Sequence, residues 1–332
     1  MYYFLGISLL LAFLLIVNMI VAALAAAFWR AISGHLEDHS VNTKAQIIFG
    51  LRILPLAAAL IFVFAFIGPS YLLLEPAGSG EVVSGKLGLL ALISSIGVLV
   101  ALYRVFGTWL ATRRLIANWM ENAVQIDVAN INVPVYRIGH QFPVIAVIGI
   151  LRPKLFIAEQ VIESLDTNEF AAAIAHEYGH LQANDNFKRT LLRVCRDLLI
   201  LPFGKDLDRA WAENAESVAD EFAAKTGRST ALDLASALVK IARIAPLNAR
   251  PAMPSGAFLL EEQNVDVTSR VRRLIRLSES KTHAAKAGLP GFSPASLIWS
   301  AALTTLMILP LVDRRFLETT HDAIERFVRI LQ

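Results

Sequence analysis

The 332-residue sequence is short of charge and of cysteine, and each shortage excludes a class of protein. Charged residues make up 18% of the chain, whereas a soluble domain carries about 25%. The single cysteine, Cys195, excludes a framework of disulfides, because it has no partner within the chain. Apolar residues make up 55%, which excludes intrinsic disorder and indicates that part of the chain lies in a membrane.

The charge balance is mild, with a net charge of +3 and a pI near 9.0. In so apolar a sequence, this small basic excess is typical of loops that face a membrane rather than of a nucleic-acid surface. We therefore expect the lipid bilayer as a partner and no nucleic acid. No pattern in the sequence indicates an oligomeric state.

Four apolar runs are long enough to cross a bilayer, whose core requires a helix of about 20 residues. They predict transmembrane helices at about 4–29, 47–74, 87–110 and 291–312. The first three make up a membrane region over residues 1–111, and residues 313–332 form a short tail. Between the third and fourth spans lies a long stretch, residues 112–290, which is large enough for a core of its own.

The lysines and arginines near the span ends predict how the chain is oriented. Twelve of them flank the spans on the side of residues 112–290, and five flank them on the other side. Because the basic side faces the cytoplasm, we expect an integral protein of a bacterial inner (plasma) membrane. Its N-terminus would lie outside and residues 112–290 in the cytoplasm.

Residues 112–290 combine strand and helix patterns. Segments 131–138, 144–151 and 155–158 are typical of strands, and the turn Arg152-Pro153-Lys154 predicts a hairpin between the last two. Asp166 and Glu169 have the spacing of a capping box, after which the sequence is helical.

The predicted helix after Asp166 contains the motif HEYGH. Four residues place His176 and His180 on the same face, one turn apart, where two imidazoles can bind one ion. Glu177 lies beside the first histidine and can take a proton from an attacking water. This is the H-E-x-x-H arrangement of zinc peptidases, and it predicts one Zn²⁺ per chain with Glu177 as the catalytic residue.

A catalytic zinc needs a third protein ligand, and the downstream run WAENAESVADEFAA offers one. Glu216 and Asp220 are four residues apart on one helical face, so that Glu216 can bind the metal while Asp220 reaches a ligand imidazole. Glu213, on a neighbouring face, is the rival ligand.

These residues carry a resemblance. HEYGH followed by Asp185 and then by Glu216-Ser-Val-Ala-Asp220 resembles the gluzincin pattern. The sequence is also similar to BlaR/MecR-type integral-membrane zinc metallopeptidases in four features. These are the hairpin GILRPKLFIA, the Pro202 segment, the stretch Arg270–Arg276 and the layout of the spans. The HtpX and CAAX prenyl protease group is a more distant likeness.

The resemblance implies roles for residues that match the motif. It implies His176, His180 and Glu216 as zinc ligands, Glu177 as the general base and Asp220 as the residue behind a ligand histidine. The expected fold is a mainly α membrane protein with four transmembrane helices and an α+β zincin-like cytoplasmic domain inserted between the third and fourth. The antibiotic-sensing members have a large extracellular penicillin-binding domain after the fourth span, whereas the sequence here has only the short tail 313–332. We therefore do not expect it to detect β-lactams directly.

The sequence thus predicts a membrane-anchored zinc-dependent endopeptidase that cleaves cytoplasmic or membrane-proximal protein substrates, such as a repressor. Two alternatives are a catalytically inert membrane signalling scaffold and an HtpX-like quality-control protease. The basic run Arg270–Arg276 is typical of a helix surface that faces solvent or lipid headgroups. No residue stands out as the one that stabilises the oxyanion.

Overall fold

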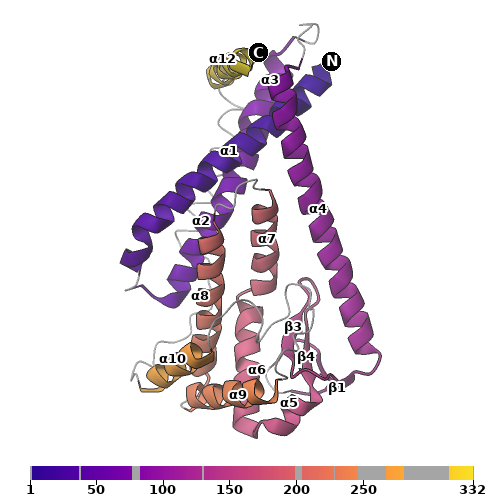
Figure 1. Cartoon of the computed structure of the whole chain (residues 1–332), viewed down its shortest axis with the longest axis vertical. Coiled ribbons are helices and arrows are strands. Elements are labelled where there is room, and N and C mark those ends of the chain that lie inside the picture. The colour runs from indigo at the N-terminus through magenta and orange to yellow at the C-terminus, as the bar shows by residue number, and fades with distance from the viewer. Residues whose placement is uncertain are drawn as a thin grey trace.

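The computed structural model describes residues 2–36, 39–76, 83–128, 131–198, 204–227, 229–245, 267–279 and 314–331. In these residues the protein is mostly helical, with one small sheet (Figure 1). The predicted fourth span, 291–312, and the Pro202 segment lie outside the described residues.

Three long apolar helices correspond to the first three predicted spans. They are α1 (Tyr2–Ile32) continued by η1 (Ser33–Leu36); α2 (Val41–Ile61) continued by η2 (Phe62–Ile67) and α3 (Gly68–Leu74); and α4 (Gly85–Met120). Each exceeds the length of about 20 residues that a bilayer core requires. The second changes to π-helical geometry directly before Gly68-Pro69, where proline removes a backbone donor. These helices suggest a membrane protein.

Two helices of the long middle stretch stand between the spans. In Figure 1, α1 and α2 diverge from α4, and α7 (Asp185–Asp197) and α8 (Lys205–Ala224) occupy the space between them. The far end of α7 touches two spans, because Asn18 Nδ2 donates to the carbonyl of Leu198 over 3.3 Å and Arg104 Nη1 lies 2.6 Å from Asp197 Oδ1. The start of α8 packs on α2 through Ile48 and Trp211, both buried.

The sheet lies at the end of the molecule away from the N-terminus (Figure 1). Its strands are β1 (Val124–Ile126), β2 (Val135–Ile138), β3 (Ile145–Ile148) and β4 (Lys154–Ala158), in the order β1-β2-β4-β3. β3 and β4 are antiparallel, which confirms the predicted hairpin, whereas β2 and β4 are parallel. The sequence did not predict β1, a strand of three residues with little burial. β1 and β3 are the two edge strands.

Helices cover the sheet and complete the core. α5 (Glu159–Ser164), α6 (Thr167–Gln182), α9 (Thr230–Ile244) and α10 (Val267–Glu279) lie at this end, and α12 (Arg314–Leu331) lies at the opposite end, near the N-terminus (Figure 1). The predicted capping box of α6 is confirmed: Asp166 Oδ1 accepts from the backbone N–H of Glu169, and Glu169 Oε2 accepts from that of Asp166, each over 2.9 Å. α6 is thereby fixed at its start, below the HEYGH motif.

Candidate metal centre

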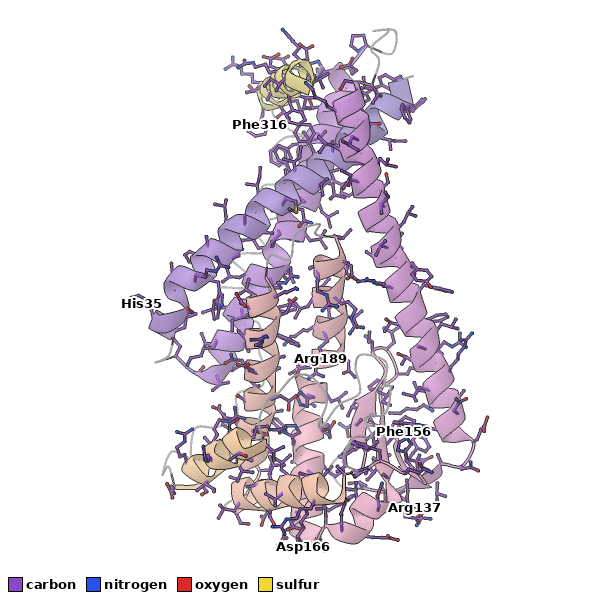
Figure 2. The ribbon with its side chains drawn as sticks, in the orientation of Figure 1. His35, Arg137, Phe156, Asp166, Arg189 and Phe316 are labelled. Carbon is purple, nitrogen blue, oxygen red and sulfur yellow. The ribbon has the colours of Figure 1, made fainter. Side chains whose placement is uncertain are left out.

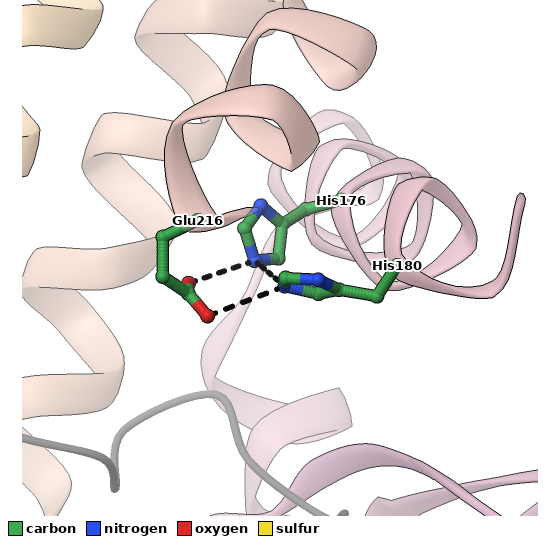
Figure 3. Close-up of side chains that lie close together, drawn as sticks. All are labelled: His176, His180 and Glu216. Atoms are coloured by element: carbon green, nitrogen blue, oxygen red, sulfur yellow. Dashed lines mark hydrogen bonds and ion pairs between the residues drawn. The ribbon is translucent and has the colours of Figure 1, made fainter. Parts of the chain in front are cut away.

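Helices α6 and α8 bring three predicted ligands together (Figure 3). The Nε2 atoms of His176 and His180 are 3.2 Å apart, and their rings are nearly perpendicular at 89°. The carboxylate of Glu216 faces both, with Oε2 at 3.6 Å from His176 Nε2 and Oε1 at 3.4 Å from His180 Nε2. Within the described residues, these three side chains form the group that can hold a metal ion, and the rival Glu213 is not part of it.

The spacing of these atoms fits a tetrahedral ion. With bonds of about 2.0–2.1 Å to nitrogen and oxygen, two ligand atoms of tetrahedral zinc lie about 3.3–3.4 Å apart. The two Nε2 atoms, at 3.2 Å, are close to that separation, and each has one oxygen of Glu216 near it, Oε1 at 3.4 Å from His180 and Oε2 at 3.6 Å from His176. One ligand atom from each of the three residues lies within 4.8 Å of the others. Two imidazoles and a carboxylate are also a ligand set that catalytic zinc uses.

A glycine allows α6 and α8 to approach closely enough for this geometry. A Cβ atom at Gly179 would lie 3.1 Å from Ala219 Cα and 3.3 Å from Phe222. Such a contact with backbone is tighter than ordinary packing, so a side chain at position 179 would separate the helices. The contact lies one residue from His180 and three from Glu216, and it therefore sets the distance between the ligands.

Each histidine is oriented by an acid behind it. Asp220 Oδ1 lies 2.9 Å from His176 Nδ1, and Asp185 Oδ2 lies 2.7 Å from His180 Nδ1. Both acids are buried, so they fix the ring orientation and leave Nε2 of each histidine toward the shared position. The sequence left the role of Asp185 open. Its contact depends on the turn at Asn184, whose left-handed backbone (φ 55°) starts α7 directly beside His180.

Glu177 lies on the same face of α6 and is 2% exposed. Its Oε2 accepts a hydrogen bond of 3.3 Å from the backbone N–H of Val147 on the edge strand β3, and its Oε1 has no partner among the described residues. Burial raises the pKa of Glu177, because the carboxylate form loses solvation. A carboxylate with a raised pKa is suited to accept a proton and then release it.

Three arginines surround the third ligand and Asp220. Arg270 Nη1 lies 3.1 Å from Glu216 Oε2, while Arg270 Nη2 donates to Asp220 Oδ1 over 2.8 Å. Arg273 also pairs with Asp220. From the other side, Arg189 Nη2 donates to Glu216 Oε1 over 3.2 Å.

The interpretation of Arg270–Arg276 as an outward-facing surface is therefore wrong for Arg270, which is 5% exposed. Arg270 and the fully buried Leu274 are four residues apart on the face of α10 that docks onto α8 and α9. That spacing of an arginine and a leucine was the available signal. It indicates one buried face, but it does not reveal which acid the arginine meets.

The charges at the centre shift the pKa values strongly. Burial alone would lower the pKa of His180, but Glu216 and Asp185 raise it to about 10. Burial alone would raise the pKa of Glu216 and of Asp220, but His180 and Arg270 lower the former and Arg270 and His176 lower the latter. Both acids are therefore ionised at neutral pH, as a metal ligand such as Glu216 must be.

A narrow cleft adjoins the centre. Residues of β3, α6 and α7 line it, among them Glu177, His180 and Arg189. Its volume is about 30 Å³, which is room for a water molecule beside Glu177. Figure 2 shows Arg189 in the middle of the molecule, on α7, between α8 and the sheet.

Two histidines and a carboxylate that can hold a metal ion, with a buried glutamate beside them, suggest a metallopeptidase. Residues 144–210 match the profile of Peptidase family M48, a family that is in general zinc-dependent. The matched segment runs from the β3–β4 hairpin through α6 and α7 into the start of α8, so it includes His176, Glu177 and His180. It supports a metallopeptidase of that family. A search of curated proteins finds no match to the chain.

Proposed function

We propose that the protein is a membrane-anchored zinc-dependent endopeptidase whose metal is held by His176, His180 and Glu216. The observation that carries the proposal is that the carboxylate of Glu216 meets two histidine Nε2 atoms that are 3.2 Å apart. Its Oε1 lies 3.4 Å from His180 Nε2 and its Oε2 lies 3.6 Å from His176 Nε2, and the carboxylate of Glu177 is buried beside them. The match of residues 144–210 to a metallopeptidase family supports the same reaction class.

When bound, a zinc ion at this site lowers the pKa of a water ligand and polarises a carbonyl group. Glu177 takes one proton from the attacking water as the water oxygen bonds to the carbonyl carbon. The C–N bond then breaks, and Glu177 delivers that proton to the leaving nitrogen. Asp220 and Asp185 hold the two imidazoles in the orientation that presents Nε2 throughout.

An extended substrate would bind along β3, the edge strand next to Glu177. The outward backbone groups of Val147 are engaged within the chain, its N–H by Glu177 and its carbonyl by Asn186 Nδ2 at 2.9 Å. A substrate that adds to this edge would take over the N–H of Val147 and release Glu177 for catalysis. This exchange couples binding of an extended segment to activation of the base.

The membrane helices define the setting of the proposed activity. The excess of lysine and arginine near the span ends on the side of residues 112–290 supports a position for them at the cytoplasmic face of a bacterial inner membrane. The substrates that we propose are therefore cytoplasmic or membrane-proximal proteins. The resemblance to BlaR/MecR-type peptidases makes a regulatory protein, such as a repressor, the substrate class that we propose.

The test compares the wild-type protein with Glu177→Gln, both expressed in membranes, for bound zinc and for cleavage of casein. Glu163→Gln is the matched control, because it makes the same change on an exposed residue of α5. We expect about one zinc in all three proteins and cleavage in the wild type and the control alone. Activity that survives in Glu177→Gln would contradict the role of the base. Zinc that remains in the double variant His176→Ala, His180→Ala would contradict the site, and zinc without cleavage in the wild type would favour an inert scaffold.

A further inference from the structure

The cleft beside Glu177 has one basic side chain other than histidine in its described lining, and that side chain is Arg189. The helix α7 carries Arg189 one turn after Asp185, which contacts His180. Arg189 therefore belongs to the same structural unit as a residue that orients a metal ligand. Neither the motif nor the matched family segment gives it a role.

The guanidinium of Arg189 is held by a contact with Glu216, and one of its N–H donors has no partner in the described part of the chain. Its side chain is 10% exposed, and Nη2 is tied to Glu216 Oε1 at 3.2 Å. Its Nε has no hydrogen-bond partner among the residues that the structure describes. A buried donor without a partner costs free energy, and its presence beside a cleft indicates that the cleft receives an acceptor.

Two other side-chain donors near the centre, Asn186 and Arg270, are already engaged, and the Nε of Arg273, unpartnered among the residues described, is not part of the described lining of the cleft. The amide of Asn186 donates to the carbonyl oxygens of Val147 and Gly149, at 2.9 and 3.1 Å. Arg270 binds Glu216 and Asp220 and is not part of the described lining of the cleft. Arg189 is thus the side chain there that offers a charged donor to an incoming substrate.

We propose that Arg189 is a catalytic residue, whose Nε–H donates to the carbonyl oxygen of the scissile peptide bond. This inference rests on the proposed peptidase function. As the water oxygen bonds to the carbonyl carbon, the carbonyl π electrons move to its oxygen, which becomes negative. The hydrogen bond from Arg189 strengthens at that moment and weakens again when the C–N bond breaks, and Arg189 keeps all its protons.

The test uses the full-length zinc-loaded protein with Arg189 changed to Met, Lys or Ala. Arg196→Met is the matched control, because Arg196 lies on the same helix, is 49% exposed and does not line the cleft. For Arg189→Met we expect kcat on a fluorogenic peptide to fall about 100- to 1000-fold, as for loss of one oxyanion donor, with KM changed less than about threefold. Bound zinc and the activity of the control should stay as in the wild type.

Chemical rescue separates catalysis from packing. Methylguanidine added to Arg189→Ala should restore part of kcat and should leave the wild type unchanged. Arg189→Lys keeps the charge beside Glu216, so this variant should keep its zinc. It should lose most of kcat, because lysine lacks the guanidinium and with it the Nε–H donor. This variant serves as the test if Arg189→Met does not fold.

The outcomes that contradict the inference differ from those that contradict the peptidase function. Wild-type turnover with an equally fast Arg189→Met or Arg189→Lys overturns the inference alone. A rise in KM at unchanged kcat also overturns it, since Arg189 would then only anchor the ground state. A loss of kcat that zinc loss fully explains would reduce Arg189 to support for Glu216. A wild type no faster than Glu177→Gln overturns both.

Discussion

The two ends of the α7–α8 pair differ in how their buried charges are matched. At the membrane end, each acid has an arginine: Asp208 binds Arg52 at 2.6 Å, and Asp197 binds Arg104 at 2.6 Å. At the metal end, four acids that are at least 86% covered meet three arginines, of which two are similarly buried and the third is 26% exposed. The acids are Glu177, Asp185, Glu216 and Asp220, the buried arginines are Arg189 and Arg270, and the more exposed one is Arg273.

This difference shows how one pair of helices separates stability from function. The pairs Arg52–Asp208 and Arg104–Asp197 hold the helices between the spans, and they do not involve the predicted metal ligands. At the metal end, three arginines and the protonated His180 offset the buried acids without the metal, and a divalent ion between His176, His180 and Glu216 would take the place of the His180 proton. We therefore expect changes at the membrane end to affect the free energy of unfolding, and changes at the metal end to affect zinc binding.

The largest effect is expected from Asp208→Ala at the membrane end. It leaves Arg52, which is 2% exposed, without its acid, and removing one partner of a buried pair costs about 3–5 kcal/mol. Denaturant unfolding in detergent should show this loss, while zinc affinity of the folded protein stays unchanged. Glu159→Ala is the control, since its pair with Arg137 is exposed and contributes about 0–1 kcal/mol. Equal losses in the two variants would contradict a structural role for the Arg52–Asp208 pair.

Arg270→Gln at the metal end should lower the zinc affinity, which Asp208→Ala should leave unchanged. It removes the side chain that ties Glu216 to Asp220, and such supporting contacts change metal affinity by about 10- to 100-fold. Competition with a zinc chelator measures the effect. Arg270→Lys should not restore the affinity, because lysine cannot bridge two carboxylates with a planar fork. The exposed Arg272→Gln on the same helix should match the wild type. An unchanged zinc affinity in Arg270→Gln would make the arginine a packing residue only.

Proton release on zinc binding sharpens the comparison further. Without the metal, the pKa of His180 is raised to about 10, so its imidazole carries a proton at pH 7. The ion binds only the unprotonated ring, and binding at pH 7 should therefore release about one proton from His180. The apparent affinity should rise with pH until pH exceeds about 10. Titration calorimetry in two buffers of different ionisation enthalpy measures the proton count, and a count of zero would contradict the assignment.

The smallest effect is expected at Glu169, an acid away from both ends. Burial would raise its pKa, but Lys240, Ser236 and the backbone of Asp166 lower it below 4.5. A lowered pKa stabilises the folded state above the unfolded value, and this contribution is lost as the pH falls through the folded value. Glu169→Gln should cost about 1 kcal/mol at pH 7. The difference in free energy of unfolding from the wild type should shrink below pH 4.5, and a difference that persists there would contradict the charge-based explanation.

Local spacing explains why most of the candidate centre could be predicted. The helical repeat alone places His176, Glu177 and His180, and the four-residue spacing of Glu216 and Asp220 assigns them to one face of a second helix. The predicted hairpin and capping box likewise depend on a few adjacent residues, and both are confirmed.

The residues that the sequence did not reveal act across long separations. The contact of Arg270 with Asp220 joins positions 50 residues apart, and that of Arg189 with Glu216 joins positions 27 apart. Each depends on how one helix docks on another, which no local pattern encodes. The contact of Val147 with Glu177 depends in the same way on the edge strand β3 packing against α6.

Because α6 and α8 approach closely at Gly179, the two variable positions of H-E-x-x-H, 178 and 179, differ in their surroundings in this chain. Tyr178 is partly exposed and its ring lies beside that of Phe222, whereas position 179 faces the backbone of Ala219. A relative with alanine or serine at position 179 would have to compensate with a smaller residue at 219 or with a wider helix crossing. A wider crossing would move Glu216 away from the two histidines, so that the residue directly before the second histidine helps to determine how closely the three ligands can meet.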